Sequence, residues 1–333
     1  MLTLGIETSC DETAVAVVED GARVLSNVIL SQTEHTRFGG VVPEIASRAH
    51  VAAITQICEE ALEGAGAALS EIELVAATRG PGLVGCLLVG LNFAKGLALA
   101  GNMDFAAVNH LEGHIAANFL NQKSPIGRHV SLVISGGHTL LVEVRGFGEY
   151  RLLGRTRDDA VGEAFDKVAK LLGLGYPGGA KIDRLSDDGD PSAIRFPRPM
   201  GKSADYDFSF SGLKTAVSLH WRALSDVERR ETVADVAASF QEAAVDILVS
   251  KTVRAARELG VSLITLSGGV AANRRLREAF IDELSRMNVA LHAPEAKLCT
   301  DNAAMIAAAG HFQFLRQGPS SLNEDADPSL RLA

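Results

Sequence analysis

The chain has 333 residues, of which 47% are hydrophobic and 22% charged, so it can bury a sizeable core and is neither disordered nor fibrous. Lysine and arginine total 32 against 41 acidic residues, and the net charge of −9 excludes a uniformly basic surface for gripping nucleic acid. This length favours two domains or a two-lobed fold. The cysteines lie far apart without a Cys-x-x-Cys pair, which argues against a disulfide framework or a zinc knuckle.

The first residues lack the basic region and cleavage site of a signal peptide and the Arg-rich face of a transit peptide. The most apolar stretch, residues 83–100, is interrupted by glycines, an asparagine and a lysine, so we expect a buried helix rather than a membrane span. These features predict a cytoplasmic protein without a membrane association.

Apolar runs predict the first elements in chain order. Residues 2–7 and 14–18 are typical of a β-hairpin whose tip is polar and acidic, and the same design recurs at 131–144 around a Ser-Gly-Gly-His turn. A third run, 262–266, also ends in Ser-Gly-Gly but passes into helical spacing at 270–280. The repeat indicates a duplicated fold with two equivalent lobes.

Apolar residues at three- and four-residue spacing predict helices between these strands, at 43–65, 83–100, 110–120, 159–172, 233–259 and 302–315. Strands alternating with helices indicate an α/β protein. Residues 175–212 are rich in proline, glycine, serine and aspartate, and we expect a long functional excursion with little regular structure.

His110 and His114 are four residues apart on a predicted helix, which stacks them about 5–6 Å apart on one face, within reach of one metal ion. The alternative is two solvated or capping histidines. Glu112 lies about 200° round the helix from His110, so this is not the His-Glu-x-x-His arrangement of zinc peptidases. Two histidines leave a metal under-coordinated; Asp301 is the candidate third ligand, with a helix N-cap as its alternative role.

Glycine-rich turns follow two predicted strands, at Ser135-Gly136-Gly137 and at Ser267-Gly268-Gly269. Such turns let backbone N–H groups approach phosphate or carboxylate oxygens, because no Cβ blocks the approach. A tight turn that needs a positive φ explains either one equally well. Two such glycine-rich turns, together with the acidic tip of the first hairpin, favour a nucleotide cleft of the kind found in the actin-like and sugar-kinase superfamily.

Four further polar or glycine positions have both a structural and a binding interpretation. Asp166 stands in mid-helix near a like charge. It has either a structural role or a role in binding a ribose. The turn at 176–179 can place Gly179 and Asp183 against the same ligand. Asn273 either caps a helix or binds a nucleotide.

Ten motifs follow one another along the chain: 5–13, 39–44, 80–83, 109–114, 135–139, 158–167, 176–179, 207–214, 267–273 and 299–302. Together, from residue 5 to about 310, they resemble the TsaD family of tRNA adenosine threonylcarbamoyltransferases, once misnamed glycoproteases. The resemblance implies a two-lobed α/β fold of actin-like, sugar-kinase-like (duplicated RNase H-like) type, with a nucleotide cleft between the lobes.

The resemblance also implies the reaction, which is transfer of a threonylcarbamoyl group from threonylcarbamoyl-AMP to N6 of adenosine 37, beside the anticodon, with release of AMP. The substrates would be tRNAs that read codons beginning with A. It implies one divalent metal, Fe2+ or alternatively Zn2+, on His110, His114 and Asp301. It places the threonylcarbamoyl-adenylate against Val133, Ile134, Ser135, Gly136, Gly137, Asp166, Gly179, Asp183 and Asn273.

An adenine N6 amine is a poor nucleophile, so the transfer needs a base, and we expect Asp11 or Glu12 to supply or orient it. The family's partners suggest a TsaB-like paralogue on the N-terminal lobe and a TsaE-like ATPase. Because of the net charge, we expect weak tRNA affinity for the chain alone, aided by basic patches at 274–277 and 251–257. The alternatives are an actin-like small-molecule kinase and a non-catalytic scaffold paralogue.

These expectations define a domain division. We place the N-terminal, partner-binding lobe at 1–109, with the helix 302–316 packed near the lobe junction. The C-terminal lobe, 110–301, would hold the metal and nucleotide site, and 317–333 would be a loose tail.

Overall fold

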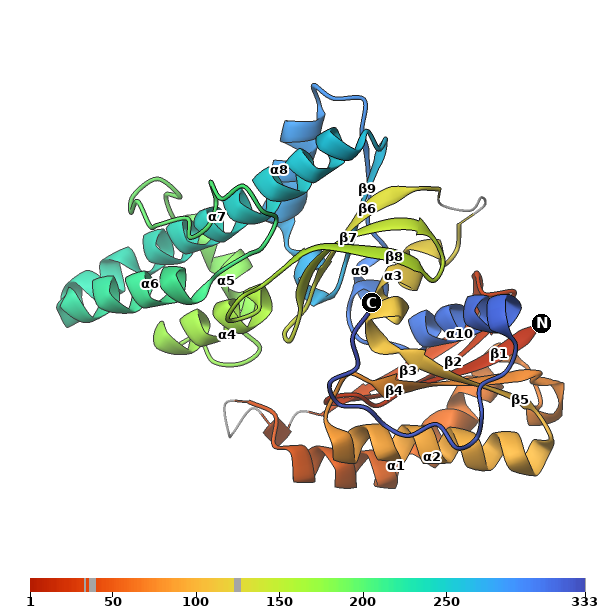
Figure 1. Ribbon diagram of the computed structural model, residues 1–333. Coiled ribbons are helices and arrows are strands. Elements are labelled where there is room, and N and C mark those ends of the chain that lie inside the picture. The colour runs from red at the N-terminus through yellow and green to blue at the C-terminus, as the bar shows by residue number, and fades with distance from the viewer. Residues whose placement is uncertain (33, 36–39, 123–126, 333) are drawn as a thin grey trace. The chain divides into compact units, whose positions relative to one another are not determined.

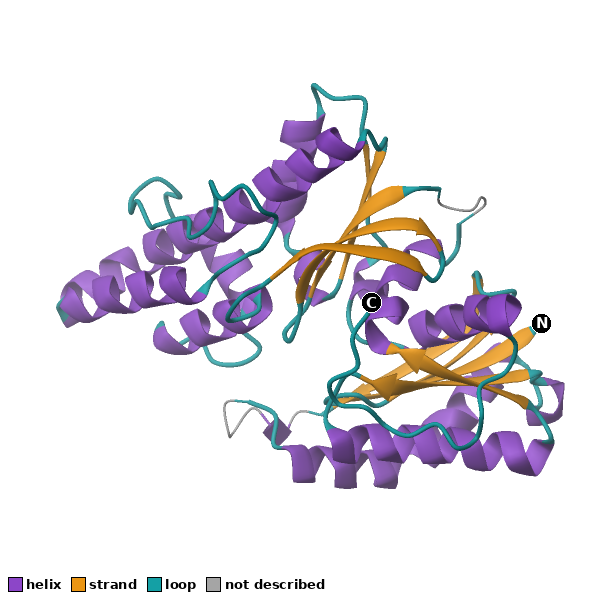
Figure 2. Cartoon of the chain, viewed as in Figure 1, coloured by secondary structure: helices purple, strands orange, loops and turns teal. Residues whose placement is uncertain are grey.

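The computed structural model describes residues 1–32, 34–35, 40–122 and 127–332, so Gly39 of the second motif lies outside the described residues. The chain forms two compact α/β units (Figures 1 and 2). Unit 1 comprises residues 1–127, 146–150 and 300–333, and unit 2 comprises 128–145 and 151–299.

Unit 1 is built on a mixed sheet with the order β3-β2-β1-β4-β5. Strands β1, β4 and β5 run parallel, while β2 and β3 form an antiparallel meander with β1. Helices α1 and α2 pack on one face of the sheet and α10 on the other (Figure 2). The bounds are β1 Leu2–Glu7, β2 Glu12–Glu19, β3 Arg23–Ser31, α1 Pro43–Ala65, η2 Leu69–Glu71, β4 Leu74–Gly80, α2 Val84–Gly101, β5 Asp104–Asn109, α3 His110–Ala116, η3 Ala117–Phe119 and α10 Ala303–Gln317.

Unit 2 repeats the design with the order β10-β9-β6-β7-β8, in which β6 and β9 are parallel and β6 and β7 antiparallel. Its core lies between this sheet and the 34-residue helix α7. The bounds are β6 His129–Ile134, β7 Thr139–Gly146, β8 Glu149–Arg155, α4 Val161–Leu171, α5 Gly179–Leu185, η4 Ser186–Asp188, α6 Ser211–Ala223, α7 Asp226–Leu259, β9 Leu263–Ser267, η5 Gly269–Ala272, α8 Arg274–Leu284, β10 Ala290–His292 and α9 Ala296–Cys299.

The two predicted hairpins are confirmed; their innermost pairs are Glu7 opposite Ala14 and Ile134 opposite Thr139. Two helix boundaries differ because side-chain caps decide them. The helix expected at 233–259 starts at Asp226, after a capping box of Ser225 and Glu228. The helix expected from 270 starts only at Arg274, and a 3-10 turn precedes it.

The boundaries of the two units differ from the boundaries that we expected for the lobes. The helix that carries His110 stays in unit 1 rather than opening the second lobe, because Gly113 packs against Met305 and Ile306 of α10. The last residues also belong to unit 1 and are not loose. Ser320 donates its N–H to the carbonyl of Phe105 at 2.7 Å, and Asp327 donates to the carbonyl of Arg79 at 2.8 Å.

Among the described residues, α2 is the one helix whose length and composition would suit a membrane span, and 33% of its apolar window is buried. Its inner face, with Leu91 and Ala94, packs into the core of unit 1. A core helix of a soluble protein passes the same test, so the feature is weak evidence for a membrane.

Small residues allow β1 and α10 to approach closely. A Cβ on Gly5 would lie 2.2 Å from the carbonyl oxygen of Ala303 and 2.7 Å from the backbone nitrogen of Ala307. On the same helix, a Cβ on Gly310 would lie 2.4 Å from Cβ of Ala76 on β4. The contact is therefore between backbones and cannot be relieved by turning a side chain.

We expect Gly5→Ala to destabilise unit 1 by about 1 to 3 kcal/mol or more, because the added methyl group must push β1 and α10 apart. Gly96→Ala is the matched control: Gly96 lies within α2, a Cβ there has no atom within 4 Å, and we expect a gain of about 0.5 to 1 kcal/mol. Urea unfolding of both variants tests this, and a Gly5→Ala midpoint equal to the wild type would contradict it.

Candidate active-site residues

The predicted metal ligands come together in unit 1. Helix α3 starts at His110, directly after β5, because Asn109 caps it by accepting a hydrogen bond from the N–H of Leu111 at 2.9 Å. The rings of His110 and His114 lie 4.7 Å apart, centroid to centroid. One ligand atom from each histidine and one from Asp301 all lie within 4.8 Å of one another.

The alternative roles considered for these residues do not account for the structure. The cap of α10 is made by Asn302, whose side chain accepts from the N–H of Met305 at 3.1 Å, and not by Asp301. The carboxylate of Asp301 lies 3.2 Å from Nε2 of His114 and 3.6 Å from Nε2 of His110. His114 is fully buried, so it is not a solvated histidine.

The chemistry of this set fits a transition metal. Within the described part of the chain, neither ring nitrogen of His114 has a hydrogen-bond partner, although both are buried. Buried polar atoms are normally satisfied, and a ligated ion would satisfy Nε2. Two imidazoles and a carboxylate suit iron or zinc, whereas magnesium prefers oxygen ligands.

Glu7 completes the centre, and the sequence analysis missed it. Its carboxylate is 1% exposed; Oε2 lies 2.9 Å from Nδ1 of His110 and accepts from the hydroxyl of Thr78 at 2.7 Å. The N–H of Ser9 donates to Oε1. A carboxylate on Nδ1 orients the ring so that Nε2 faces the metal side, which is a recurring arrangement at metal sites. The signal in the sequence was an acid at the end of a buried strand, since a buried charge needs partners.

The topology explains why these groups meet. Strands β1, β4 and β5 are parallel, so their carboxyl ends lie at one edge of the sheet. Glu7 ends β1, Thr78 lies near the end of β4, and His110 follows β5.

The charges of the centre are coupled. Burial lowers the pKa of His110, but the carboxylates of Asp301 and Glu7 outweigh it and raise the value to about 9. Burial raises the pKa of Glu7, but the charge and hydrogen bond of His110 outweigh burial, so the net shift is downward. Without an ion, the two groups therefore form an imidazolium–carboxylate pair at neutral pH.

Asp11 and Glu12 lie at the tip of the β1–β2 hairpin in the same unit. Burial raises the pKa of Glu12 to about 9, and the carboxylates of Asp301 and Asp11 add to this. Without an ion, this pKa favours the protonated form of Glu12 at neutral pH, which can donate a hydrogen bond.

The nine residues expected to bind the adenylate all belong to unit 2, and five of them, 133–137, lie at the carboxyl end of β6 and in the turn after it. The turn after β6 begins at Ser135, and Gly162 at the start of α4 packs so closely on it that a Cβ would lie 2.5 Å from the carbonyl of Ser135. A Cβ on Gly268, after β9, would lie 2.3 Å from the carbonyl of Ile134. Gly136 and Gly137 have open space where their Cβ atoms would be.

Three of the remaining candidates, Asp166, Asp183 and Asn273, have structural roles. Asp166 accepts from the N–H of Gly178 at 2.7 Å, which fixes the turn before Gly179. Asp183 pairs with Arg274 at 3.0 Å. Asn273 caps α8 by accepting from the N–H of Leu276 and donates to Gln241 at 2.7 Å.

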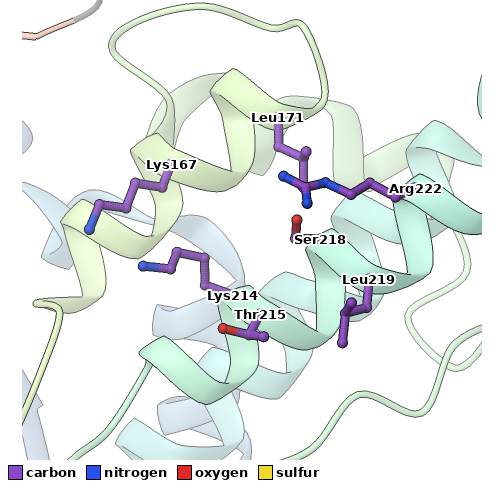
Figure 3. Close-up of a pocket in the computed structure, with 7 residues that line it drawn as sticks. All are labelled: Lys167, Leu171, Lys214, Thr215, Ser218, Leu219 and Arg222. Carbon is purple, nitrogen blue, oxygen red and sulfur yellow. The ribbon is translucent and has the colours of Figure 1, made fainter.

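A groove of about 300 Å³ lies elsewhere in unit 2, between α4 and α6 (Figure 3). It contains none of the nine candidate residues. Two of its cations are paired with two carboxylates, since Lys167 and Lys214 both pair with Asp159 and Lys167 also pairs with Glu163. The lining residues are Lys167, Leu171, Lys214, Thr215, Ser218, Leu219 and Arg222.

Solved structures with the same fold have little sequence similarity to the chain. Full-length HypF, in its phosphate- and nucleotide-bound form, aligns with a TM-score of 0.62 and 13% identity over 96% of this chain and 56% of its own. Component A of (R)-2-hydroxyglutaryl-CoA dehydratase from Acidaminococcus fermentans aligns with a TM-score of 0.56 and 16% identity, over 94% of this chain and 98% of its own. These likenesses confirm the predicted α/β fold of actin-like type.

The sequence comparisons identify the family. The family model described as TsaD, tRNA N6-adenosine threonylcarbamoyltransferase, matches residues 23–308. The protein of that name from Anaeromyxobacter sp. (strain Fw109-5) is 55% identical over 100% of both chains, and that from Caldicellulosiruptor bescii is 50% identical over 100% of this chain and 98% of its own. The chain belongs to the TsaD family of tRNA N6-adenosine threonylcarbamoyltransferases and is an enzyme of tRNA modification.

Proposed function

We propose that this chain transfers the threonylcarbamoyl group of threonylcarbamoyl-AMP to N6 of adenosine 37 in tRNAs that read codons beginning with A, and releases AMP. The observation that carries the proposal is the intact cluster of His110, His114 and Asp301 in a chain that matches its family along its whole length. A scaffold would have no need of these three ligands. A kinase of this fold would instead be expected to hold magnesium on oxygen atoms.

The metal that His110, His114 and Asp301 would hold is Fe2+, or alternatively Zn2+. When bound, the ion offers open coordination positions that can grip and polarise oxygen atoms of the threonylcarbamoyl group. Glu7 acts through His110, whose tautomer and ring plane it sets.

Unit 2 supplies the groups for the adenylate. Gly136 and Gly137 follow a strand end and have open space where their Cβ atoms would be, and we propose that their N–H groups hold the phosphate or the anionic carbonyl oxygen. Val133, Ile134 and Ser135 position that turn. We propose that Asp166 and Asp183 accept hydrogen bonds from ribose hydroxyls and that Gly179 and Asn273 line the nucleoside.

Asp11 is our candidate for the base that takes the proton from N6, with Glu12 as its hydrogen-bonding partner. The raised pKa of Glu12 supports this assignment, because a protonated carboxyl group orients a neighbouring carboxylate and cannot accept a proton itself.

Two partners complete the proposal, a TsaB-like paralogue on unit 1 and a TsaE-like ATPase. Support for the first comes from exposed apolar side chains on the outer helices, Val51 of α1 at 65% and Val84, Leu88 and Leu99 of α2 at 53%, 45% and 74%. We place the reaction in the cytoplasm, where its tRNA substrate is found.

The reaction is tested by incubating the chain and these partners with threonylcarbamoyl-AMP and unmodified tRNA, then digesting the tRNA and detecting threonylcarbamoyladenosine by mass spectrometry. We expect product with the wild type and at least about 100-fold less with His110→Ala/His114→Ala, because the ion loses two of three ligands. Arg230→Gln, an exposed change on α7 of unit 2, is the surface control. No product from the wild type, where a family member works, would refute the proposal.

The assignment of the base is tested by Asp11→Asn and Glu12→Gln in the same assay. We expect Asp11→Asn to lower kcat by roughly 10²- to 10⁴-fold, because an amide cannot take the proton. Glu12→Gln keeps a hydrogen-bond donor and should stay within about tenfold of the wild type. Equal activity of Asp11→Asn and wild type, with equal metal content, would remove Asp11 from this role.

The role of Glu7 is tested without activity, by metal affinity. We expect Glu7→Gln to weaken metal binding by about 10- to 100-fold in competition with a chelator, because the amide orients His110 less strongly and donates no charge. Asp104→Asn, at the exposed start of β5, is the control carboxylate in the same sheet. Unchanged affinity of a folded Glu7→Gln protein would show that Glu7 serves folding alone.

A further inference from the structure

Unit 2 carries five exposed arginines that lie in or beside the β7–β8 edge of its sheet, and the reaction and partners above do not use them. We define the arginine face as Arg128, Arg145, Arg151, Arg155 and Arg157. The side chains of Arg128, Arg145, Arg151 and Arg157 are 48–62% exposed.

Three of these arginines share one carboxylate. Glu143 is completely buried on β7; its Oε1 accepts from Nε of Arg128 at 2.8 Å, and its Oε2 lies 2.7 Å from Nε of Arg151 and 3.3 Å from a terminal nitrogen of Arg145. One arginine would have been enough to compensate a buried carboxylate. The arrangement therefore holds three guanidinium groups in place and leaves two positive charges uncompensated.

The face continues along the edge strand β8 and past its end. Arg151 and Arg155 are four residues apart, so they lie on the same side of the strand about 13 Å apart. In the described part of the chain, the guanidinium group of Arg155 has no carboxylate partner, and Arg157 pairs with Asp207. Four of the five arginines thus pair with only two carboxylates, Glu143 and Asp207, in a chain whose net charge is −9.

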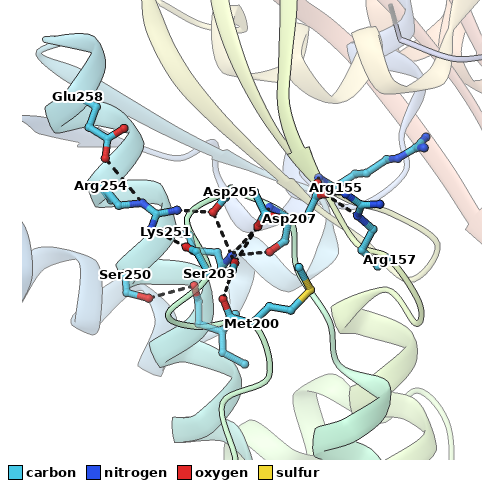
Figure 4. A network of polar contacts seen from close by, with 11 residues as sticks. Arg155, Arg157, Met200, Ser203, Asp205, Asp207, Ser250, Lys251, Arg254 and Glu258 are labelled. Carbon is cyan, nitrogen blue, oxygen red and sulfur yellow. Dashed lines mark hydrogen bonds and ion pairs between the residues drawn. The ribbon is translucent and has the colours of Figure 1, made fainter.

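The loop that contains Ser203 and Asp207 lies beside the arginine face and is held by cations of α7 (Figure 4). Lys251 of α7, which is 1% exposed, donates to the hydroxyl of Ser203 at 2.8 Å and to the carbonyl of Asp207 at 2.5 Å. Arg254 stacks on the ring of Tyr206, 4.8 Å from its centroid, and donates to the carbonyl of Ser203 at 2.8 Å. These cations hold the loop, so the position of Asp207 and its partner Arg157 is set in advance.

We propose that the arginine face binds the phosphate backbone of the tRNA substrate, an inference that rests on the proposed function. Arginine forks bind phosphate oxygens in pairs, and here their side chains are already ordered, which lowers the entropy lost on binding. Two arginines of the basic run at 274–277 are already neutralised by carboxylates. Arg274 pairs with Asp183 and Asp187, and Arg275 pairs with Glu242.

The test uses the double variant Arg145→Gln/Arg155→Gln, which leaves Arg128 and Arg151 on Glu143 and so keeps that carboxylate paired. The matched control is Arg222→Gln/Arg230→Gln. Arg230 lies on α7 about 36 Å along the helix from Arg254, and it is exposed. Binding of unmodified tRNA by the chain with its partners is measured by fluorescence anisotropy from 50 to 200 mM KCl.

We expect Kd at 100 mM KCl to rise about tenfold in the Arg145/Arg155 variant and to stay within twofold in the control. The slope of log K against log salt should fall by about 1.5, since two phosphate contacts are lost. Arg145→Lys/Arg155→Lys should restore most of the affinity, because a phosphate contact needs the charge. An unchanged Kd and slope, or an equal loss in the control, would overturn the proposal. The proposal would also be overturned if the Arg145/Arg155 variant bound tRNA normally but no longer bound an acidic protein partner.

The same preparations separate this proposal from the proposed function. If the wild type makes threonylcarbamoyladenosine while the Arg145/Arg155 variant binds tRNA as well as it does, the arginine face is wrong and the function stands. If the wild type makes none with its partners present, the proposed function fails whatever the binding result.

Discussion

The hydrogen bond between Glu7 and His110 is the interaction on which the candidate metal centre depends. A carboxylate that is 1% exposed is costly to bury unless its oxygens are paired, and Glu7 pairs with His110, Thr78 and the N–H of Ser9. These partners come from the ends of β4 and β5 and from the turn after β1. The buried charge of Glu7 therefore needs partners from several parallel strand ends, and the same hydrogen bond orients His110, the first candidate metal ligand.

The third ligand depends on a different constraint, which is the close approach of β1 and α10. Gly5 lets the carbonyl of Ala303 come within 2.2 Å of where a Cβ would be. Asp301 precedes that helix by two residues, and the cap at Asn302 leaves its carboxylate directed to the histidines. A strand and a helix almost 300 residues apart thus meet through small residues, and the metal ligands meet as a consequence.

The spacing of residues in the sequence predicted those parts of the molecule that depend on contacts between residues close in the chain. The spacing of His110 and His114 and the two hairpins could be read directly, because helical and strand periodicity decide them. Glu7 could not be found in this way, since its partners lie far along the chain. The same holds for the last residues, which looked loose but bind the edge of the sheet through contacts such as Ser320 to Phe105.

Charge is the clearest case in which composition and structure give different answers. Screening limits an exposed charge to about 8 Å at physiological salt, so a polyanion responds to the local surface and not to the net charge of −9. A run of basic residues does not locate that surface either, because Arg274 and Arg275 stand beside carboxylates that cancel them. The positive charge that a polyanion meets depends on the number of carboxylates within reach of each cation. Around Glu143 three arginines share one, and the excess positive charge remains where a phosphate backbone can reach it.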